Sequence, residues 1–360
     1  MINFLQQKNL SKIQIVGIDA TKEPNSSNKG TSYEVIDNSI LRVIPIDVDC
    51  PHFSDVIKSV STVNEIKETY SKLIDNYIKI IRQEKPDLIL LNGTYFVPWS
   101  LFQAGSIEKI PMVLHYHGIL TKETSQYDPS VRDLIHKMET TFDNDSLLYI
   151  FPSKLAQKTV EEEVFGHQIS RSVVIPNPIP NYFFETKGVN SQKEIAFVGR
   201  WSNIKNPKFI KKFIKYNQNK LSDYRINIVS DKEKASKDLL DYANSVKFYS
   251  PMENKKLANF YGKMGIVISP SFFETYGNVA QESIASGTPA LVGPNMGVSE
   301  IFRQVGLSDF IVDFSSTKNV YYKIKKFSGR PIDKKVKDML KYNLTPNIIS
   351  EKLIKALKSA

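Results

Sequence analysis

The chain has 360 residues, which is enough for two domains and a sizeable core. Hydrophobic residues make up 41% and charged residues 24%, a composition that excludes a wholly disordered chain, a collagen and a coiled coil. The net charge of +10 is uneven, because residues 1–180 hold 18 basic and 22 acidic side chains whereas residues 181–360 hold 30 and 16.

Several further classes are excluded by simple sequence features. No apolar run approaches the roughly 20 residues of a membrane helix. The N-terminus has no basic start followed by a long apolar stretch, so we expect no secretory signal and a cytoplasmic protein. Cys50 is the single cysteine, which excludes an internal disulfide and any cysteine-based zinc or iron–sulfur site.

In the first half, strand-like runs alternate with helical patterns. Strands are expected over 13–18, 41–46, 88–91, 111–117 and 147–151. Residues 63–84 carry apolar side chains at the spacing of one face of a long amphipathic helix, which Lys85-Pro86-Asp87 should end. This alternation predicts an α/β doubly wound domain.

A proline-rich stretch separates this pattern from a second one. Residues 175–180 contain three prolines, and the alternation then restarts with a helix over 207–218 and strands over 195–198, 225–229, 266–268 and 290–292. We therefore expect an N-terminal domain over 1–180, a second α/β domain over 181–343 and a C-terminal helix over 344–360. Ligands of such sheets bind beyond the carboxyl ends of the strands, so a central cleft between the two domains is the expected site.

The most informative stretch covers residues 266–300. A buried strand is followed by a loop that carries Glu274 and by a helix over about 277–286 that carries Glu282. Gly287 suits the left-handed position just past a helix end, and Pro289 prevents continuation. The backbone N–H groups of residues 276–278 would form an anion site at the positive end of this helix. The alternative is an ordinary pair of surface carboxylates.

A second stretch, over 197–207, combines a strand, a glycine turn at Gly199 and a helix that starts near Pro207. Arg200 and Lys205 would project from the connecting loop. Two fixed cations can neutralise a diphosphate and stabilise it as a leaving group. Two solvated surface cations are the alternative interpretation.

His115-Tyr116-His117-Gly118 stands at a strand end in the first domain, where a histidine could line the cleft or, with its neighbour, bind a metal. A packed or solvated histidine is the alternative.

The two Asp-x-Asp matches, at 47–49 and 143–145, are interpreted as chance. The chain has no Gly-Lys-Ser/Thr P-loop and no Gly-x-Gly-x-x-Gly.

Taken together, these stretches resemble the retaining glycosyltransferases of family 4, which have the GT-B fold of two Rossmann-like doubly wound domains facing a central cleft. The match is strongest over 195–300. The residues that carry it are Gly199-Arg200, Lys205-Asn206, Glu274 through Glu282, Ser286-Gly287-Thr288-Pro289 and Gly297-Val298-Ser299-Glu300. Weaker matches are Pro86-Asp87, His117-Gly118, Ser153 and Ile175-Pro176-Asn177.

The resemblance implies roles for the nucleotide part of the donor. Arg200 and Lys205 would hold the donor diphosphate, and Glu282 would hydrogen-bond the ribose hydroxyls. The 181–343 domain would therefore bind the nucleotide sugar, and the 1–180 domain would bind the acceptor.

The resemblance also implies the groups around the reacting sugar. Glu274 would contact the donor sugar, with the backbone of Tyr276, Gly277 and Asn278 nearby. His117 would lie in the cleft beside the donor sugar and the acceptor. His117 and Glu274, together with the two cations of the Gly-Arg loop, are the expected catalytic groups.

The expected activity is retaining transfer of a sugar, from a UDP-sugar, to a glycan, glycolipid or protein acceptor in cell-surface polysaccharide or glycoconjugate synthesis. No metal and no other cofactor is expected. The sequence departs from the family at three turns: no Gly-Gly occurs within residues 19–30, residues 229–231 replace Gly-Asp-Gly, and Ser250-Pro251 replaces a common glycine. These departures motivate the alternative of a non-catalytic binding or partner subunit.

The basic charge peaks at residues 318–360, with 12 basic and 3 acidic side chains. The last part of this segment has the pattern of an amphipathic helix, with Ile348, Leu353, Ile354 and Leu357 on one face. We expect it to contact an anionic membrane or to pack back on the first domain. The protein would then be cytoplasmic, with peripheral contact at the inner membrane face. Nucleic-acid binding is not expected, because no recognition module is present.

Overall fold

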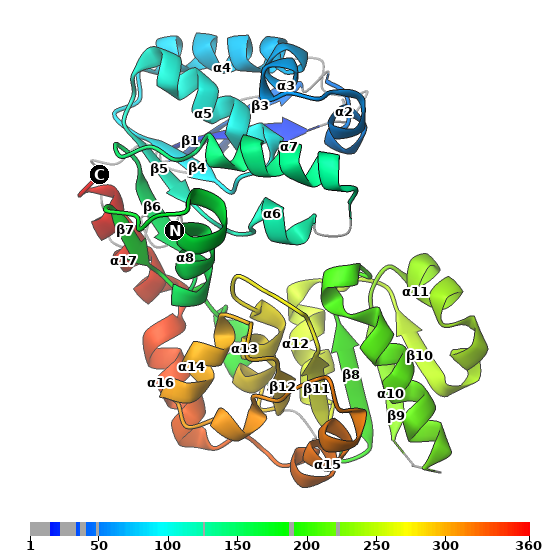
Figure 1. Cartoon of the computed structure of the whole chain (residues 1–360). Coiled ribbons are helices and arrows are strands. Elements are labelled where there is room, and N and C mark those ends of the chain that lie inside the picture. Colours follow the sequence, from blue (N-terminus) through cyan, green and yellow to red (C-terminus); the bar gives the residue numbers. More distant parts are fainter. Residues whose placement is uncertain are drawn as a thin grey trace. The chain divides into compact units, whose positions relative to one another are not determined.

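The computed structural model describes residues 15–21, 34–36, 41–47, 50–124, 127–186, 191–220 and 224–360 (Figure 1). The chain divides into two compact units, and each is discontinuous in sequence. The first unit comprises Met1–Phe151, Val160–Val173 and Ser350–Ala360. The second comprises Pro152–Thr159 and Val174–Ile349. That the first domain binds the acceptor and the second binds the nucleotide sugar stays a prediction.

The first unit contains two sheets within the described residues. One has the order β1-β3-β2, with β1 parallel to β3 and β2 antiparallel to it; its strands are β1 (Ile15–Thr21), β2 (Glu34–Ile36) and β3 (Leu41–Asp47). The other has the order β4-β5-β6-β7, comprising β4 (Ile89–Asn92), β5 (Met112–His115), β6 (Leu148–Phe151) and β7 (Ser172–Val174). Of residues 19–30, which lack the family's Gly-Gly, residues 22–30 lie outside the described residues.

Helices accompany these sheets. They are α2 (Phe53–Ser59), α3 (Val63–Thr69), α4 (Ser71–Glu84), α5 (Phe96–Glu108), α6 (Leu120–Glu123), α7 (Pro129–Thr140), a π-helical turn (Glu161–Phe165) and α17 (Pro346–Leu357), most of which belongs to this unit. Figure 1 shows α4 beside α5, and Arg82 of α4 donates to Glu108 of α5 at 3.0 Å.

The expectation of one continuous helix over 63–84 is wrong. The chain leaves helical geometry at Tyr70 (φ −97°, ψ 14°), which separates α3 from α4. Tyr70 is fully buried, and its ring stacks on Phe96 of α5 at a centroid distance of 4.9 Å. Apolar spacing alone does not reveal this break, because it does not show that the large ring of Tyr70 is buried against a neighbouring helix.

The second unit is built on one parallel sheet of five strands in the order β10-β9-β8-β11-β12. The strands are β8 (Glu194–Val198), β9 (Arg225–Val229), β10 (Val246–Tyr249), β11 (Ile266–Ser269) and β12 (Ala290–Val292). Strand β8 is central, and the order reverses between β8 and β11. In a doubly wound sheet this switch point is where ligands bind.

In sequence, a helix follows each strand of this sheet, and further helices belong to the same unit. They are α8 (Lys154–Val160), α9 (Asn181–Phe184), α10 (Pro207–Asn219), α11 (Lys232–Asp238), α12 (Asn254–Gly262), α13 (Asn278–Ala285), α14 (Val298–Gln304), α15 (Thr317–Phe327) and α16 (Lys334–Leu344). Short 3-10 turns cover Asn203–Lys205, Leu240–Ser245 and Ser308–Phe310.

Local signals set the ends of two of these helices. Pro207 opens α10 as expected, because its fixed φ suits the first helical position. Gly277 precedes α13 at φ +116°, and Gly287 follows it at φ +88°, both in the region that favours glycine. The helix predicted over 277–286 is therefore present with glycines at both boundaries. Among the described residues, no helix combines the length and the apolar character needed to cross a membrane.

Candidate functional site

The loops after β8 and β11 meet at the switch point of the second unit's sheet. Lys205 follows β8 and Glu274 follows β11, and Lys205 Nζ donates to Glu274 Oε1 at 2.8 Å. The two side chains are 23% and 15% exposed. Because β8 and β11 are neighbours, two residues 69 positions apart become an ion pair that is largely withdrawn from solvent.

Further groups hold Glu274 in place. The hydroxyl of Ser271 donates to Oε1 at 2.5 Å, and that of Ser269 is 3.5 Å from the same oxygen. The Glu274 backbone N–H donates to Asn295 O at 3.2 Å, and Gly297 N donates to Glu274 O at 3.1 Å. The carboxylate is thus fixed at both its side chain and its backbone. The two serines were not singled out from the sequence.

The loop that carries Lys205 is equally constrained. Gly199 has φ +142°, and a Cβ on it would lie 3.5 Å from Lys205 Cε, so the lysine chain passes close over the glycine. Ile204 O accepts from Phe272 N at 2.9 Å, which joins this loop to the one that bears Glu274.

Asn206 completes the connection. It caps α10 in the left-handed conformation (φ +58°), and its Oδ1 accepts from Phe209 N at 3.1 Å. Its Nδ2 donates to Pro270 O, at the end of β11, at 3.2 Å. The asparagine of the Lys-Asn pair therefore joins the two loops and stands beside the lysine that it follows in sequence.

The start of α13 lies beyond Glu274. Gly277 occupies the cap position, and no side chain caps the helix there. The Tyr276 side chain is buried and donates to Gln281 Oε1 at 2.9 Å, so only its backbone can face a ligand. Asn278 Oδ1 accepts from Asn177 Nδ2 at 2.9 Å. A helix start without a side-chain cap suits an anion, because the first N–H groups have no partner inside the helix.

Glu282 lies further along α13, in an apolar setting. Burial raises the pKa of Glu282 to about 7, and the hydroxyl of the fully buried Tyr261 donates to Oε2 at 3.4 Å. Tyr261 comes from α12, so its contact with Glu282 depends on how the two helices pack. No sequence signal pointed to it.

Arg200 is exposed, unlike Lys205. The residue after it is anchored: Trp201 Nε1 donates to Asp238 Oδ2 at 3.0 Å, and Lys211 Nζ donates to Asp238 Oδ1 at 3.0 Å. The backbone on either side of Arg200 is therefore held, while its guanidinium faces solvent.

His117 lies in the first unit, just beyond the end of β5. Its Nε2 is 2.5 Å from Asn92 Oδ1, and its ring centroid is 4.2 Å from that of His115. Desolvation lowers the pKa of His117, and burial lowers the pKa of His115 to about 3, so the pair is uncharged near neutral pH. Its expected place beside the donor sugar stays a prediction.

Across the described residues, no three or more His, Cys, Asp or Glu side chains are grouped as a metal site. Asp143, from one of the two Asp-x-Asp matches, instead binds His167 Nε2 at 2.7 Å. At the switch point, the positive charge near the carboxylate comes from Lys205.

Two family models match adjoining stretches of the chain. Residues 59–181 match Glycosyltransferase Family 4, and residues 179–343 match Glycosyl transferases group 1. The chain belongs to the glycosyltransferases of the family 4 type, as the resemblance implied, and the retaining mechanism stays a prediction. It has the GT-B fold of two Rossmann-like domains, which its structural neighbours share.

Individual relatives agree with this class. A sucrose-phosphate synthase from Thermosynechococcus elongatus has a TM-score of 0.74 at 15% identity, over 99% of this chain and 91% of that one. HepE from Anabaena, in complex with UDP and glucose, has a TM-score of 0.67 at 14% identity, over 97% and 100%. An uncharacterized 41.2 kDa protein in the cps region of Klebsiella pneumoniae is 28% identical over 132 residues, or 36% of each chain. The chain spans about a third of the length of the curated relatives it matches.

Proposed function

We propose that this glycosyltransferase moves a sugar with retention from a nucleotide-diphosphate donor, a UDP-sugar, to a glycan, glycolipid or protein acceptor. The observation that carries the proposal is the Lys205–Glu274 pair at the switch point, 2.8 Å apart and largely buried. A fixed cation beside a fixed carboxylate suits a ligand with an anionic half and a hydroxyl-rich half. HepE, with which the chain shares its fold, was solved with UDP and glucose.

In the proposed mechanism, Lys205 and Arg200 stabilise the charge that develops on the departing diphosphate. The buried lysine is positioned in advance, and the exposed arginine closes on the ligand from solvent. The start of α13 adds backbone N–H groups to the same anion. These cations supply the charge that a metal would otherwise provide, so the proposed transfer needs no metal and no other cofactor.

The carboxylates have separate proposed tasks. Glu282 accepts hydrogen bonds from the ribose hydroxyls, and Glu274 accepts them from the donor sugar. Glu274 Oε1 already receives Lys205 and Ser271, so these contacts hold its orientation toward the sugar. His117 lines the acceptor side. No side chain is assigned as a covalent nucleophile, which a double displacement would require.

Calorimetric titration of UDP, GDP and ADP, with and without magnesium, tests the donor site. We expect micromolar binding of UDP, unchanged by magnesium and lost in Lys205→Ala. Lys208→Ala, on the first turn of α10, is the matched control and should bind normally. Failure of every nucleotide to bind at millimolar concentration would overturn the proposal and favour the non-catalytic partner subunit.

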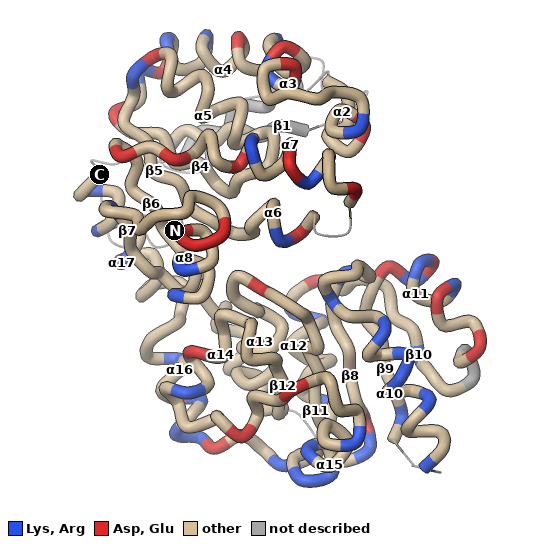
Figure 2. The backbone as a smooth tube through the Cα atoms, viewed as in Figure 1, with Lys and Arg blue, Asp and Glu red and all other residues tan. Residues whose placement is uncertain are grey.

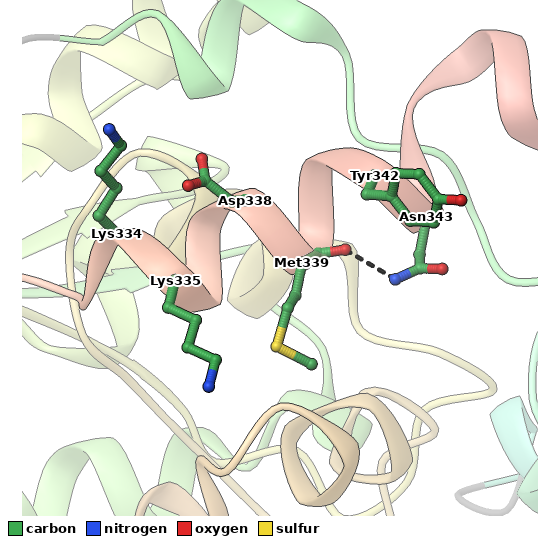
Figure 3. Close-up of a pocket in the computed structure, with 6 residues that line it drawn as sticks. All are labelled: Lys334, Lys335, Asp338, Met339, Tyr342 and Asn343. Atoms are coloured by element: carbon green, nitrogen blue, oxygen red, sulfur yellow. Dashed lines mark hydrogen bonds between the residues drawn. The ribbon is translucent and has the colours of Figure 1, made fainter.

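We also propose that the enzyme works at the inner membrane face, in cell-surface polysaccharide or glycoconjugate synthesis. Lysine residues lie along α15 and α16, coloured blue on the backbone tube (Figure 2). On α16, Lys334, Lys335 and Tyr342 help to line an open cavity of about 510 Å³ (Figure 3). Tyr342 is 80% exposed. Lysines with an exposed tyrosine suit an anionic lipid surface.

The membrane proposal concerns 318–344, because Ser350–Ala360 belongs to the first unit, where Arg171 Nη2 donates to Ala360 O at 3.2 Å. Co-sedimentation with anionic and neutral vesicles tests it. We expect recovery with anionic vesicles alone, reduced in the double variant Lys334→Glu/Lys335→Glu. Equal recovery with both vesicle types would refute the lipid contact and leave the donor site untouched.

A further inference from the structure

Asn92 and His115 end two neighbouring strands of the first unit. They face each other in the register of β4 and β5, so their side chains leave the sheet at the same edge. The chain then turns at Gly93, whose N–H donates to His115 O at 2.8 Å. His117 follows two residues after His115, and its ring lies close to both Asn92 and His115.

The contact between Asn92 and His117 defines a proton position. His117 Nε2 is 2.5 Å from Asn92 Oδ1, and an amide oxygen can only accept a hydrogen bond. A neutral imidazole carries its hydrogen on one nitrogen, and a bond to this amide oxygen requires that the nitrogen be Nε2.

His115 supports this arrangement from the side. Its ring lies 4.2 Å from the His117 ring at an interplanar angle of 48°. Its Nε2 is buried and has no hydrogen-bond partner among the described residues. A charged ring there would lack a compensating partner, so the His115 ring that lies against His117 stays uncharged.

We propose that Asn92 is a positioning residue that holds His117 as the Nε2–H tautomer, in one ring orientation against His115. The inference rests on the proposed function only in that His117 takes part in the transfer. An imidazole fixed in one tautomer presents the same atom to the substrate in every turnover, whereas a ring that flips presents it for part of the time.

The test is a long-range proton–nitrogen correlation spectrum of the full chain with labelled histidines, recorded above about pH 8 so that the rings are neutral. The chain has 5 histidines, and His117→Gln assigns the signal. We expect a single Nε2–H tautomer in the unaltered protein. Asn92→Leu should give averaged nitrogen shifts, whereas Asn92→Asp, which keeps an acceptor at this position, should retain the Nε2–H form.

Activity gives the second readout. In Asn92→Leu, kcat should fall about tenfold with the UDP Kd unchanged, and Asn92→Asp should recover most of it. An Nδ1–H signal in the unaltered protein, or an unchanged tautomer in Asn92→Leu, would overturn the inference. If the unaltered protein did not bind UDP, the proposed function would be refuted instead. The spectrum would still test the inference about Asn92, because it needs neither nucleotide nor acceptor.

Discussion

The buried carboxyl of Glu282 leads to one prediction about both the stability of the protein and its affinity for the nucleotide. Burial raises the pKa of its carboxyl from an ordinary 4.5 to about 7. The folded protein therefore holds a proton that the unfolded chain has already released between these two values. We predict that Glu282→Gln, which replaces the carboxylate by a neutral group of similar shape, stabilises the protein at alkaline pH and weakens nucleotide binding.

The sign follows from proton linkage. Because the folded state binds more protons across this window, stability falls as pH rises from 4.5 to about 7 and then levels off. A shift of this size corresponds to about 3 kcal/mol, of which roughly 2 to 3 kcal/mol develops between about pH 5 and pH 8. Glutamine does not ionise, so the variant lacks this loss.

Denaturant unfolding at about pH 5 and pH 8 measures the effect. The stability gained by Glu282→Gln over the unaltered protein should be small at the lower pH and about 2 kcal/mol larger at the higher one. Glu253→Gln is the matched control, because Glu253 is 78% exposed and should show no such difference. In parallel, UDP affinity should rise through pH 7 in the unaltered protein and stay flat in the variant. Equal pH slopes in the two proteins would refute the reasoning.

Three further predictions concern groups near the switch point. Lys205→Ala should lower kcat at least about a hundredfold while the circular dichroism spectrum is unchanged; near-normal turnover would remove this lysine from the site. Gly277→Ala should cost roughly 2 kcal/mol of stability in denaturant titrations, because φ is +116° and a Cβ would lie 3.0 Å from both Met296 Cε and Val298 Cγ1; an unchanged midpoint would contradict this account. Glu300→Ala should destabilise the second unit by about 1 kcal/mol, since its carboxylate accepts from the first N–H groups of α8 at 3.1 and 2.7 Å. Thermal melts compared with Glu253→Ala would show whether that cap contributes.

Two strands of the second unit's sheet could be predicted because nearly all of their residues are apolar. Ile266–Ser269 and Ala290–Val292 are buried along their whole length and were expected almost as found. Val246–Tyr249 was not expected, because Lys247 interrupts its apolar residues and the strand therefore lacks that signal. The break at Tyr70 was missed because apolar spacing does not show that this ring stacks on Phe96 of another helix.

The residues of the candidate site also fall into those that the sequence could identify and those that it could not. Lys205 and Glu274 could be singled out because each follows a predicted strand, and adjacent parallel strands bring such loops together. Ser271 and Tyr261 could not be, because one depends on the path of a loop and the other on how α12 packs on α13. Type and spacing identify the charged groups, whereas the neutral groups that orient them are fixed by tertiary structure.

The segments of the two units alternate along the sequence, and this affects the order in which the units are completed during synthesis. The second unit is complete at Ile349, whereas the first unit includes Ser350–Ala360. During synthesis, domains generally fold as units once their residues are available, usually N-terminal first. Here the first unit, although it begins first, acquires its last helix only after the second unit has been fully synthesised. A chain that ends near residue 349 would therefore contain the whole of the second unit and a first unit that still lacks its final segment.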